Sequence, residues 1–350
     1  MVDFSLPYSV KWNIYKVNVD TWDESSSLPG VVSVSLDRDC SDDVPLLESS
    51  SMSFDSDLGT NFEDGYYRVI ADFIQGSSFE RHPITTQLYQ SSSVTYDYGI
   101  KQWSIDGQSV LLPASEIYMR DGSYVPKNSN GGQWALNQLR STIKAPVYMD
   151  GDGFYLKRHV VYDSNDSVLS AVWGVLDAGK WCIRITGNGV VMLTEKPKNP
   201  SLILNESNLR ILHPEIKSNR SKRGIPNRYI VRYGTEEIVM TNDDPDSETS
   251  TVNVGRYIDA PIDANPYLMV GESPYEYAKR KLEEVSTIRI SYDYTREYYP
   301  DIYPMSIVSA TLPRLGLDGD LRVVQQKLTL DTGIYVNETA YLEHKFWKVV

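Results

Sequence analysis

The order of its parts constrains the fold of this chain more than any single motif does. Alternating apolar and polar residues, the period of β-strands, fill roughly the first hundred residues. Two short helix-plus-hairpin patterns follow, and strand-like sequence then returns, broken once by a helical pattern at Ser273–Ile288. We therefore predict an α+β, mainly β protein with two β-barrel-like domains, an inserted pair of small α/β units, and a helix that interrupts the second barrel. The expected bounds are residues 1–108 for the first barrel, 109–198 for the insert and 199–350 for the second barrel, with the helical insertion at 243–288.

The first segment shows the strand period and one break in it. Val10, Trp12 and Ile14 share one face. Val17 resumes the pattern out of phase, which predicts a β-bulge near Tyr15–Lys16. Further strands are expected at 32–36, 52–54, 67–73, 94–99 and 101–105. Two polar stretches are expected to be turn and edge sequence: Asp37–Asp43 and Ser49–Ser53.

The middle segment repeats a helix-then-strand design. Gln133–Lys144 places apolar residues on one helical face, and two Asp-Gly pairs then turn the chain into an expected strand at Phe154–Val161. In the second unit, Asp166 or Ser167 caps a helix that ends at Gly179, where we expect a left-handed residue. The hairpin that follows is expected to turn at Gly187-Asn188-Gly189, so no phosphate-binding loop is assigned there.

The last segment contains the clearest helix start in the chain. Ser273 at the N-cap, Pro274 at the first position and Glu276 at the third form a capping box. The helix is expected to bury four residues at steps of three and four: Tyr275, Ala278, Leu282 and Val285. Strands are expected at 202–204, 228–233, 236–241, 288–294, 302–312, 321–331 and 333–342, with turns at Asp318-Gly319 and Asp331-Thr332-Gly333.

Composition excludes several classes of protein. A net charge of −13 argues against a protein that grips nucleic acid, because such proteins need clustered Lys and Arg. Cys40 and Cys182 are expected to be reduced thiols, although one disulfide between them stays an alternative. Met1–Tyr8 does not resemble a signal peptide, and we expect no membrane anchor. The one basic cluster lies in a polar stretch that we interpret as a solvated loop: Lys217, Arg220, Lys222 and Arg223.

No stretch carries the arrangement that catalysis requires. Gly271-Glu272-Ser273-Pro274 lacks the second glycine of a hydrolase nucleophile elbow, and Ser273 already serves as a cap. The four histidines are isolated and show no metal-ligand spacing: His82, His159, His213 and His344. We predict no catalytic residue, no cofactor and no resident metal ion, so the chain is not expected to be an enzyme.

Two polar clusters leave alternatives open. Acidic runs arise readily in a chain with 47 acids, and the acidic residues in question are Asp150, Asp152, Asp243, Asp244, Asp246 and Glu248. A solvated loop is the simpler interpretation of the acidic residues from Asp243 to Glu248, although binding of a calcium ion by their carboxylate oxygens stays an alternative. Strand packing is the simpler interpretation of a tyrosine cluster near two prolines, and a sugar-binding platform is its alternative: Tyr292, Tyr294, Tyr298, Tyr299 and Tyr303.

The layout resembles a known family over nearly the whole chain. The stretches that carry the likeness are Val31–Asp39, Tyr66–Ile74, Ser167–Leu176 with Trp181–Leu193, Tyr267–Glu284, Ser306–Leu312 and Asp320–Glu338 with Arg322-Val323-Val324. The chain is similar to the central hub protein of tailed-phage baseplates and tail tips, which related contractile injection systems share. The resemblance implies a homotrimer whose two barrels per subunit form a pseudo-sixfold ring around a DNA exit channel. It also implies the tail tube or distal tail protein as one partner and the spike, fibre or tape-measure protein as the other.

The resemblance and the composition lead to one function and two alternatives. The expected function is a structural hub in the virion, synthesised in the host cytoplasm, through which DNA passes without specific binding. The first alternative is a carbohydrate-binding adhesin that recognises host cell-surface sugars through the tyrosine cluster. The second, a cell-wall hydrolase, ranks last because the sequence offers no residue to carry the reaction.

Overall fold

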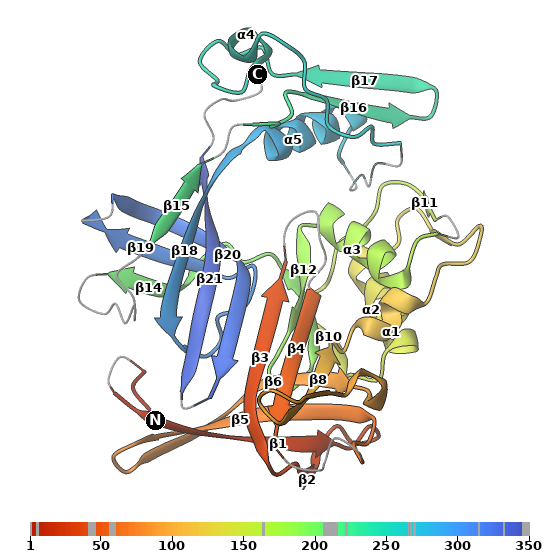
Figure 1. Ribbon diagram of the computed structural model, residues 1–350. Helices are drawn as coiled ribbons and strands as arrows, with labels where there is room; N and C mark the ends of the chain where they lie inside the picture. Colours follow the sequence, from red (N-terminus) through yellow and green to blue (C-terminus); the bar gives the residue numbers. More distant parts are fainter. Residues whose placement is uncertain are drawn as a thin grey trace.

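The computed structural model is mainly β, as the sequence predicts. It describes residues 2–4, 7–40, 47–55, 61–162, 165–205, 216–220, 223–264, 266, 268, 271–313, 316–331 and 333–344. Within these ranges, most strands belong to one sheet of fourteen strands, and five α-helices lie outside it. Figure 1 shows the first part of the chain at the bottom, the last strands at the left, the helical insert at the right and a small cap at the top. No described helix combines the length and the apolar character that a membrane span needs.

The first half of the sheet is built by the N-terminal strands. Their bounds are β1 Ser9–Val17, β2 Glu24–Ser27, β3 Val31–Asp39, β4 Leu47–Phe54, β5 Gly65–Gln75, β6 Ser78–Tyr89, β7 Thr95–Asp97 and β8 Gln102–Gln108, with a 3₁₀ turn at Ser91–Ser93. The register between β1 and β2 shifts between Tyr15 and Val17, so the expected bulge is confirmed. The strands curl around one apolar core, in which Leu36, Phe54 and Phe73 are fully buried. The alternation in the sequence therefore produces a barrel-like first half.

The serine-rich strand β4 lies inside the sheet, so the expectation that Ser49–Ser53 is edge sequence is wrong. β4 pairs with β3 on one side and with β8 on the other. Serine is tolerated there because the buried Ser50 hydroxyl has partners: it donates to Gln87 Oε1 at 2.6 Å and lies 2.7 Å from the Tyr89 hydroxyl.

The second half of the sheet comes from the C-terminal part of the chain. Its strands are β14 Pro200–Asn205, β15 Lys217–Arg220, β18 Ile288–Glu297, β19 Ile307–Leu312, β20 Leu317–Leu330 and β21 Ile334–His344. Their apolar side chains form a second core around Val308, Leu321 and Val323. Asp318 and Gly319 pair with β19 inside β20, so the turn expected at these residues is wrong. The chain turns earlier, where Gly316 N–H donates to Pro313 O at 3.0 Å.

One strand pair joins the two halves. β20 runs antiparallel to β3 over six residue pairs, from Gln325 opposite Asp39 to Leu330 opposite Val34. Each half also carries a buried Arg–Glu ion pair near this junction: Arg38–Glu48 at 2.9 Å and Arg296–Glu338 at 2.5 Å. The two barrel-like halves therefore share one continuous sheet.

The insert is a small mixed sheet covered by helices. Its elements are α1 Leu112–Glu116, β9 Tyr124–Val125, α2 Gly131–Thr142, β10 Val147–Met149, β11 Val160–Val161, α3 Val168–Ala178, β12 Trp181–Ile185 and β13 Val191–Glu195. Ser167 is the N-cap of α3, because its hydroxyl accepts the Ser170 N–H at 3.1 Å. In the three-stranded sheet, β13 lies between parallel β10 and antiparallel β12. The two helix-strand units expected to repeat therefore differ, since one contributes a single strand and the other a hairpin.

Phe154 explains two wrong expectations in the insert. The strand expected at Phe154–Val161 is reduced to Val160–Val161, because the backbone groups before it bond to separate partners, such as Gly131 N–H to Phe154 O at 2.6 Å. Gly179 is right-handed, with φ −80°, and the left-handed residue is Lys180. Glycine is required at 179 for space, since a Cβ there would lie 2.4 Å from the Phe154 ring.

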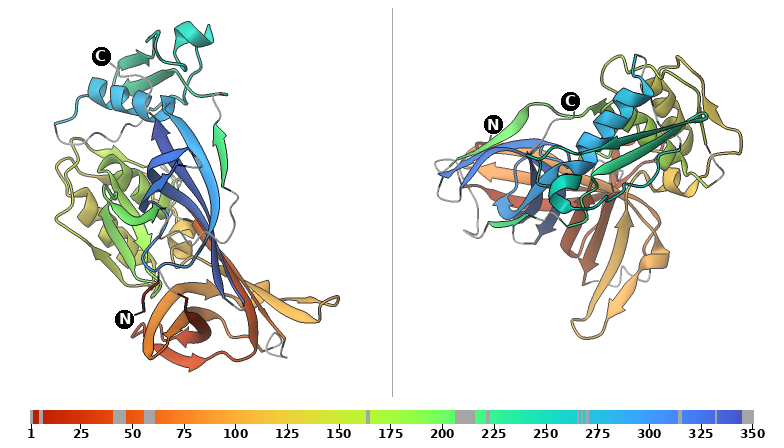
Figure 2. Two further views of the ribbon diagram at one scale, coloured as in Figure 1. Left: turned by 90° about the vertical axis from the view of Figure 1, so that its left-hand side faces the viewer. Right: turned by 90° about the horizontal axis from the view of Figure 1, so that it is seen from above.

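A cap forms at the far end of the second half. It contains the hairpin β16 Arg228–Tyr233 and β17 Glu236–Thr241, the short α4 Thr251–Val254 and α5 Pro274–Ser286. The hairpin forms its own two-stranded sheet and packs on α5 through Tyr229, Val231 and Leu282. Tyr275 is exposed, contrary to expectation, and Tyr277 takes the buried position, where its hydroxyl donates to Asp263 Oδ2 at 2.6 Å. Figure 1 and the left view of Figure 2 show the cap and the first half at opposite ends of the molecule.

The tip of the insert hairpin locks onto the first half of the sheet. Asn188 O accepts hydrogen bonds from Trp22 Nε1 at 2.8 Å and from Arg68 Nη2 at 3.0 Å. Gly187 O accepts one from Thr86 Oγ1 at 2.9 Å. The expected turn at Gly187-Asn188-Gly189 is confirmed, and it also fastens the insert to β5 and β6.

Candidate functional site

The serine weighed as a nucleophile serves the fold. Ser273 Oγ accepts the Glu276 N–H at 3.1 Å, and Glu276 Oε2 accepts the Ser273 N–H at 2.7 Å. These reciprocal bonds are the capping box that the sequence predicts. The hydroxyl is therefore committed to starting α5.

The two histidines whose side chains the structure describes have different partners. His82 Nε2 lies 3.0 Å from Glu80 Oε1, and His159 Nδ1 accepts the Lys127 N–H at 3.2 Å. His213 and the His344 side chain lie outside the described residues. Within the described ranges, no three side chains of His, Cys, Asp or Glu come together as a metal site.

The acidic loop at 243–248 is organised by local hydrogen bonds. Asp243 Oδ1 accepts the Thr251 hydroxyl at 2.5 Å, and Asp244 Oδ1 accepts the Asp246 N–H at 2.9 Å. Glu248 pairs with Arg220 of the basic cluster at 3.2 Å. The other described members of that cluster, Lys217 and Arg223, are exposed, and Lys222 lies outside the described residues.

The cysteines and the tyrosine cluster are both parts of the interior. Cys40 and Cys182 are buried and are not joined by a disulfide, and burial raises the pKa of the Cys182 thiol. Four of the five clustered tyrosines are buried, and only Tyr299, with 38% exposed, reaches the surface. Tyr298 stacks on Phe73 with 5.6 Å between ring centroids, and Arg184 lies over the Tyr303 ring at 4.3 Å. These rings do not form the exposed platform that the sugar-binding alternative needs.

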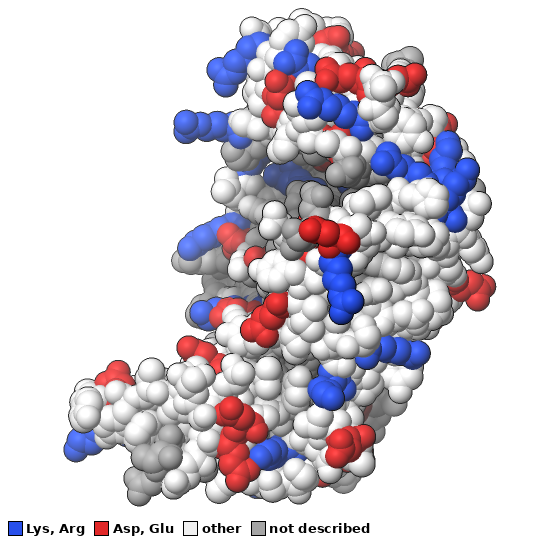
Figure 3. Space-filling view, turned by 90° about the vertical axis from the view of Figure 1, so that its right-hand side faces the viewer, with Lys and Arg blue, Asp and Glu red and all other residues white. Residues whose placement is uncertain are grey.

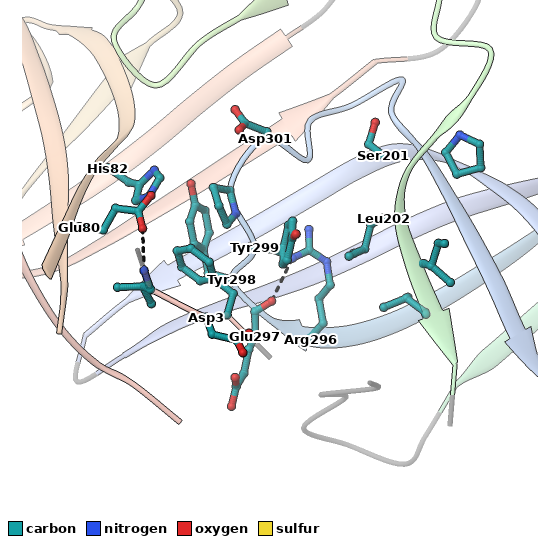
Figure 4. A pocket seen from close by; sticks show the side chains of 16 residues that line it. Asp3, Glu80, His82, Ser201, Leu202, Arg296, Glu297, Tyr298, Tyr299 and Asp301 are labelled. Atoms are coloured by element: carbon teal, nitrogen blue, oxygen red, sulfur yellow. Dashed lines mark hydrogen bonds and ion pairs between the residues drawn. The ribbon is translucent and has the colours of Figure 1, made fainter. Parts of the chain in front are cut away.

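A hollow of about 650 Å³ lies where the two halves of the sheet meet the N-terminal segment (Figure 4). Four separate parts of the chain line it: residues 2–4, Glu80 with His82 on β6, residues 200–204 on β14, and residues 296–301, which form the end of β18 and the turn after it. Phe4 contacts both sides of the hollow, since its ring centroid lies 5.7 Å from that of His82 and 5.8 Å from that of Tyr299. The hollow is thus walled by aromatic rings drawn from both ends of the sequence.

The charged groups of the hollow are mostly carboxylates. Four acids line it, Asp3, Glu80, Glu297 and Asp301, against one guanidinium, that of Arg296. The Val2 N–H donates to Glu80 Oε2 at 2.9 Å and thereby lowers the pKa of Glu80 below its usual value. Glu80 is therefore an ionised acceptor, and it lacks the raised pKa that a general acid near neutral pH requires.

Arg296 does not balance the acids in the hollow. Its Nε and Nη2 atoms donate to the Glu338 carboxylate at 2.9 and 2.5 Å, and both side chains are buried. A third bond runs from Nη1 to Glu297 O at 2.9 Å. The guanidinium charge is consequently matched by a carboxylate that lies outside the hollow.

Two other surfaces expose apolar side chains. The hairpin of β7 and β8 extends away from the body (Figure 2), and Tyr98 at its tip is 86% exposed. On the insert, the cross-strand partners Tyr124 and Val161 are both exposed. Figure 3 shows the face that carries the insert, where acidic and basic side chains are interspersed around a broad uncharged area. Exposed apolar surface of this kind is typical of proteins that contact other proteins.

Sequence reasoning missed the hollow because its walls come from four distant segments. Tyr298 and Tyr299 were singled out, but Phe4, Glu80 and Glu297 were not. The only local signal was the density of aromatic residues around Pro300.

Solved structures that share this fold include phage tail proteins. The chain aligns with a tail protein from Neisseria meningitidis MC58 with a TM-score of 0.62 at 10% identity, over 96% of each chain. It aligns with the 43 kDa tail protein of prophage MuSo2 from Shewanella oneidensis with a TM-score of 0.60 at 12% identity, over 95% of this chain and 96% of the other. A prophage tail protein from Listeria monocytogenes gives a TM-score of 0.55 at 11% identity, over 93% and 94%. No protein-family model and no curated protein sequence matches the chain.

Proposed function

We propose that the protein is the structural hub of a phage tail tip or baseplate. The observation that carries this proposal is the fold shared with three tail proteins over at least 93% of every chain compared. This coverage extends over the barrel-like halves, the insert and the cap together, rather than over one module, and so supports the proposal. The hub would join the tail tube or distal tail protein to the spike, fibre or tape-measure protein.

The proposed assembly is a homotrimer with pseudo-sixfold symmetry. Two barrel-like halves per subunit supply six similar units to a threefold ring, which can match a sixfold tube. Heterologous contacts repeated around an axis close such a ring. The continuous sheet supports this arrangement, because the β3–β20 pairing fixes one half relative to the other within each subunit.

The proposed channel lets DNA pass without holding it. A chain with net charge −13 repels the phosphate backbone of DNA overall, and tight binding of DNA would need a concentrated basic surface. We accordingly propose a virion location and a structural role without catalysis. The burial of Tyr298 and Tyr303 gives no support to the sugar-binding alternative.

Mass photometry over a concentration series tests the assembly. We expect particles of three chain masses, or monomers that become trimers when the neighbouring tail proteins are added. A stable closed dimer would contradict the proposal, since it would supply four barrel-like halves where the proposed pseudo-sixfold ring needs six.

Gel mobility of double-stranded DNA tests the channel. The trimer should leave the mobility of a short duplex unchanged at physiological salt. Retention of the duplex that weakens as salt rises would reveal phosphate binding and refute passage without grip.

A further inference from the structure

A layer of polar side chains lies inside the first half of the sheet, next to its apolar core. Arg38 and Glu48 are cross-strand partners on β3 and β4, and Thr85 and Gln87 lie on β6. All four side chains are at most 4% exposed. Because side chains two residues apart on a strand share a face, Arg38 lies on the same side of β3 as the core residue Leu36. The polar layer therefore lies in the interior.

The guanidinium of Arg38 connects β4 with β6. Its Nε atom donates to Glu48 Oε1 at 2.9 Å, and its Nη2 atom donates to the backbone oxygen of Ile84 at 2.8 Å. Both nitrogens belong to one rigid planar fork, so the two acceptor oxygens are neighbours. Thr85 directly follows Ile84 in the chain. The Glu48 carboxylate is consequently held beside this part of β6.

The Ser50 hydroxyl makes a second connection between the same two strands. It donates to Gln87 Oε1 at 2.6 Å. Ser50 lies two residues from Glu48 on β4 and shares a face with it. Gln87 lies two residues from Thr85 on β6 and shares a face with that residue. The two connections therefore close a ring that brings Glu48, Thr85 and Gln87 toward one another.

Three polar atoms of this ring have no hydrogen-bond partner within the described chain: Glu48 Oε2, Thr85 Oγ1 and Gln87 Nε2. An ionised carboxylate oxygen accepts, an amide nitrogen donates, and a hydroxyl does either. A donor and an acceptor within about 3 Å of each other would bond directly, so these atoms are held further apart. Buried polar groups normally have partners, and a group left without one costs free energy. The three atoms thus call for a small molecule that both donates and accepts.

We infer that the ring binds one buried water molecule. The water donates to Glu48 Oε2, accepts from Gln87 Nε2 and makes its third bond with the Thr85 hydroxyl, and about three bonds are typical of an internal water. A cation does not fit, because Arg38 already pairs with Glu48 and the Gln87 amide presents N–H groups. An anion does not fit beside the Glu48 carboxylate. This inference does not rest on the proposed role in a tail.

A high-resolution crystal structure of the full chain tests for the water directly. We expect a density peak at about 2.7–3.2 Å from both Glu48 Oε2 and Gln87 Nε2. A direct hydrogen bond between these two atoms, or a ring that holds no such peak, would overturn the inference.

Thr85→Val provides an independent test in solution, because valine has nearly the shape of threonine but no hydroxyl. If the hydroxyl bonds to water, the variant loses a buried hydrogen bond, and the equilibrium constant for unfolding in urea titration should rise about fivefold. An unchanged or lower constant would contradict the inference, since valine would then replace a hydroxyl that had no partner.

Thr329→Val is the matched control for this measurement. Thr329 is a strand residue of β20 that is only half-buried and has no part in the ring. We expect its substitution to change the equilibrium constant for unfolding by less than about twofold. A rise as large as that of Thr85→Val would show that the loss is a general effect of replacing a strand threonine, and would refute the water site as its cause.

Discussion

The close contact between the insert hairpin and the first half of the sheet predicts that one added methyl group, in Gly187→Ala, strongly lowers the free energy of unfolding. A Cβ at Gly187 would lie 1.7 Å from Pro83 O and 2.4 Å from the Pro83 carbonyl carbon, both of them backbone atoms that no rotamer change can move. Gly187 is not among the residues with positive φ, so Gly187→Ala strains the backbone only through this collision. The turn must retreat from β6 to accommodate the new atom.

The size of the destabilisation follows from the hydrogen bonds that are lost when the turn moves away from β6. Two neutral donors, Trp22 Nε1 and Thr86 Oγ1, and one charged donor, Arg68 Nη2, bond to carbonyl oxygens of the turn. At about 1 kcal/mol for each neutral bond and about 2 kcal/mol for the charged one, Gly187→Ala should lower the free energy of unfolding by about 4 kcal/mol. A loss of that size is a large part of the roughly 5–15 kcal/mol that stabilises a typical domain.

Urea denaturation measures the loss, and hydrogen exchange of the Trp22 indole N–H reports where it arises. Gly333→Ala is the matched control: Gly333 also lacks a positive φ, and its Cβ would meet only the Tyr335 ring at an ordinary 3.4 Å. We expect the control to change the free energy of unfolding by less than about 1 kcal/mol. If Gly187→Ala is no more harmful than Gly333→Ala, and Trp22 exchange is unchanged, the hairpin does not fasten the insert as argued.

Three further predictions concern single interactions. Asp177→Asn should destabilise the protein at neutral pH, and thermal unfolding across pH measures the difference from wild type. That difference should shrink as pH falls below 3.8, because the nearby lysines lower the pKa of Asp177. It should also shrink as pH rises past 10.5, because the partner Lys281 has a raised pKa. Ser273→Ala removes the N-cap of α5 and should lower the unfolding free energy by about 1 kcal/mol in urea titration, whereas a neutral result would mean that the cap is dispensable. Glu338→Leu leaves the buried Arg296 guanidinium without its carboxylate and should lower the unfolding free energy by about 3–5 kcal/mol. The double variant with Arg296→Met should restore most of this loss. If stability does not recover, the ion pair is not the cause of the loss.

Local signals in the sequence predicted local structure well. The capping box at Ser273 depends on residues within one turn, so the pattern was sufficient. For α3 the pattern left Asp166 and Ser167 open, and the structure selects Ser167. Tyr275 and Tyr277 show the limit of periodicity, because the orientation of the helix depends on Asp263, which hydrogen bonds to Tyr277 from outside the helix. The assignment of Ser49–Ser53 to an edge failed because the partners of Ser50 come from β6.

The alternation of apolar and polar residues could not predict which strands pair when they lie far apart in the sequence. Two barrel-like regions were visible as separate runs of alternation, but nothing in either run indicates that β3 pairs with β20, nearly the whole chain away. The hollow was hidden for the same reason, since residues 2–4, β6, β14 and the segment after β18 meet only in the folded protein. Ser273 was correctly predicted to be an N-cap, because this structural role depends on neighbouring residues alone.

The shared sheet also determines how the molecule responds to force. A pull along β3 and β20 loads all six of their residue pairs at once, so the backbone ladder resists as a unit. A pull across the strands would open the pairs one at a time and meet far less resistance. Rocking of one half against the other would have to break this ladder, so movement under load is expected at the hairpin contact of the insert and at the cap, while the sheet itself behaves as a stiff plate.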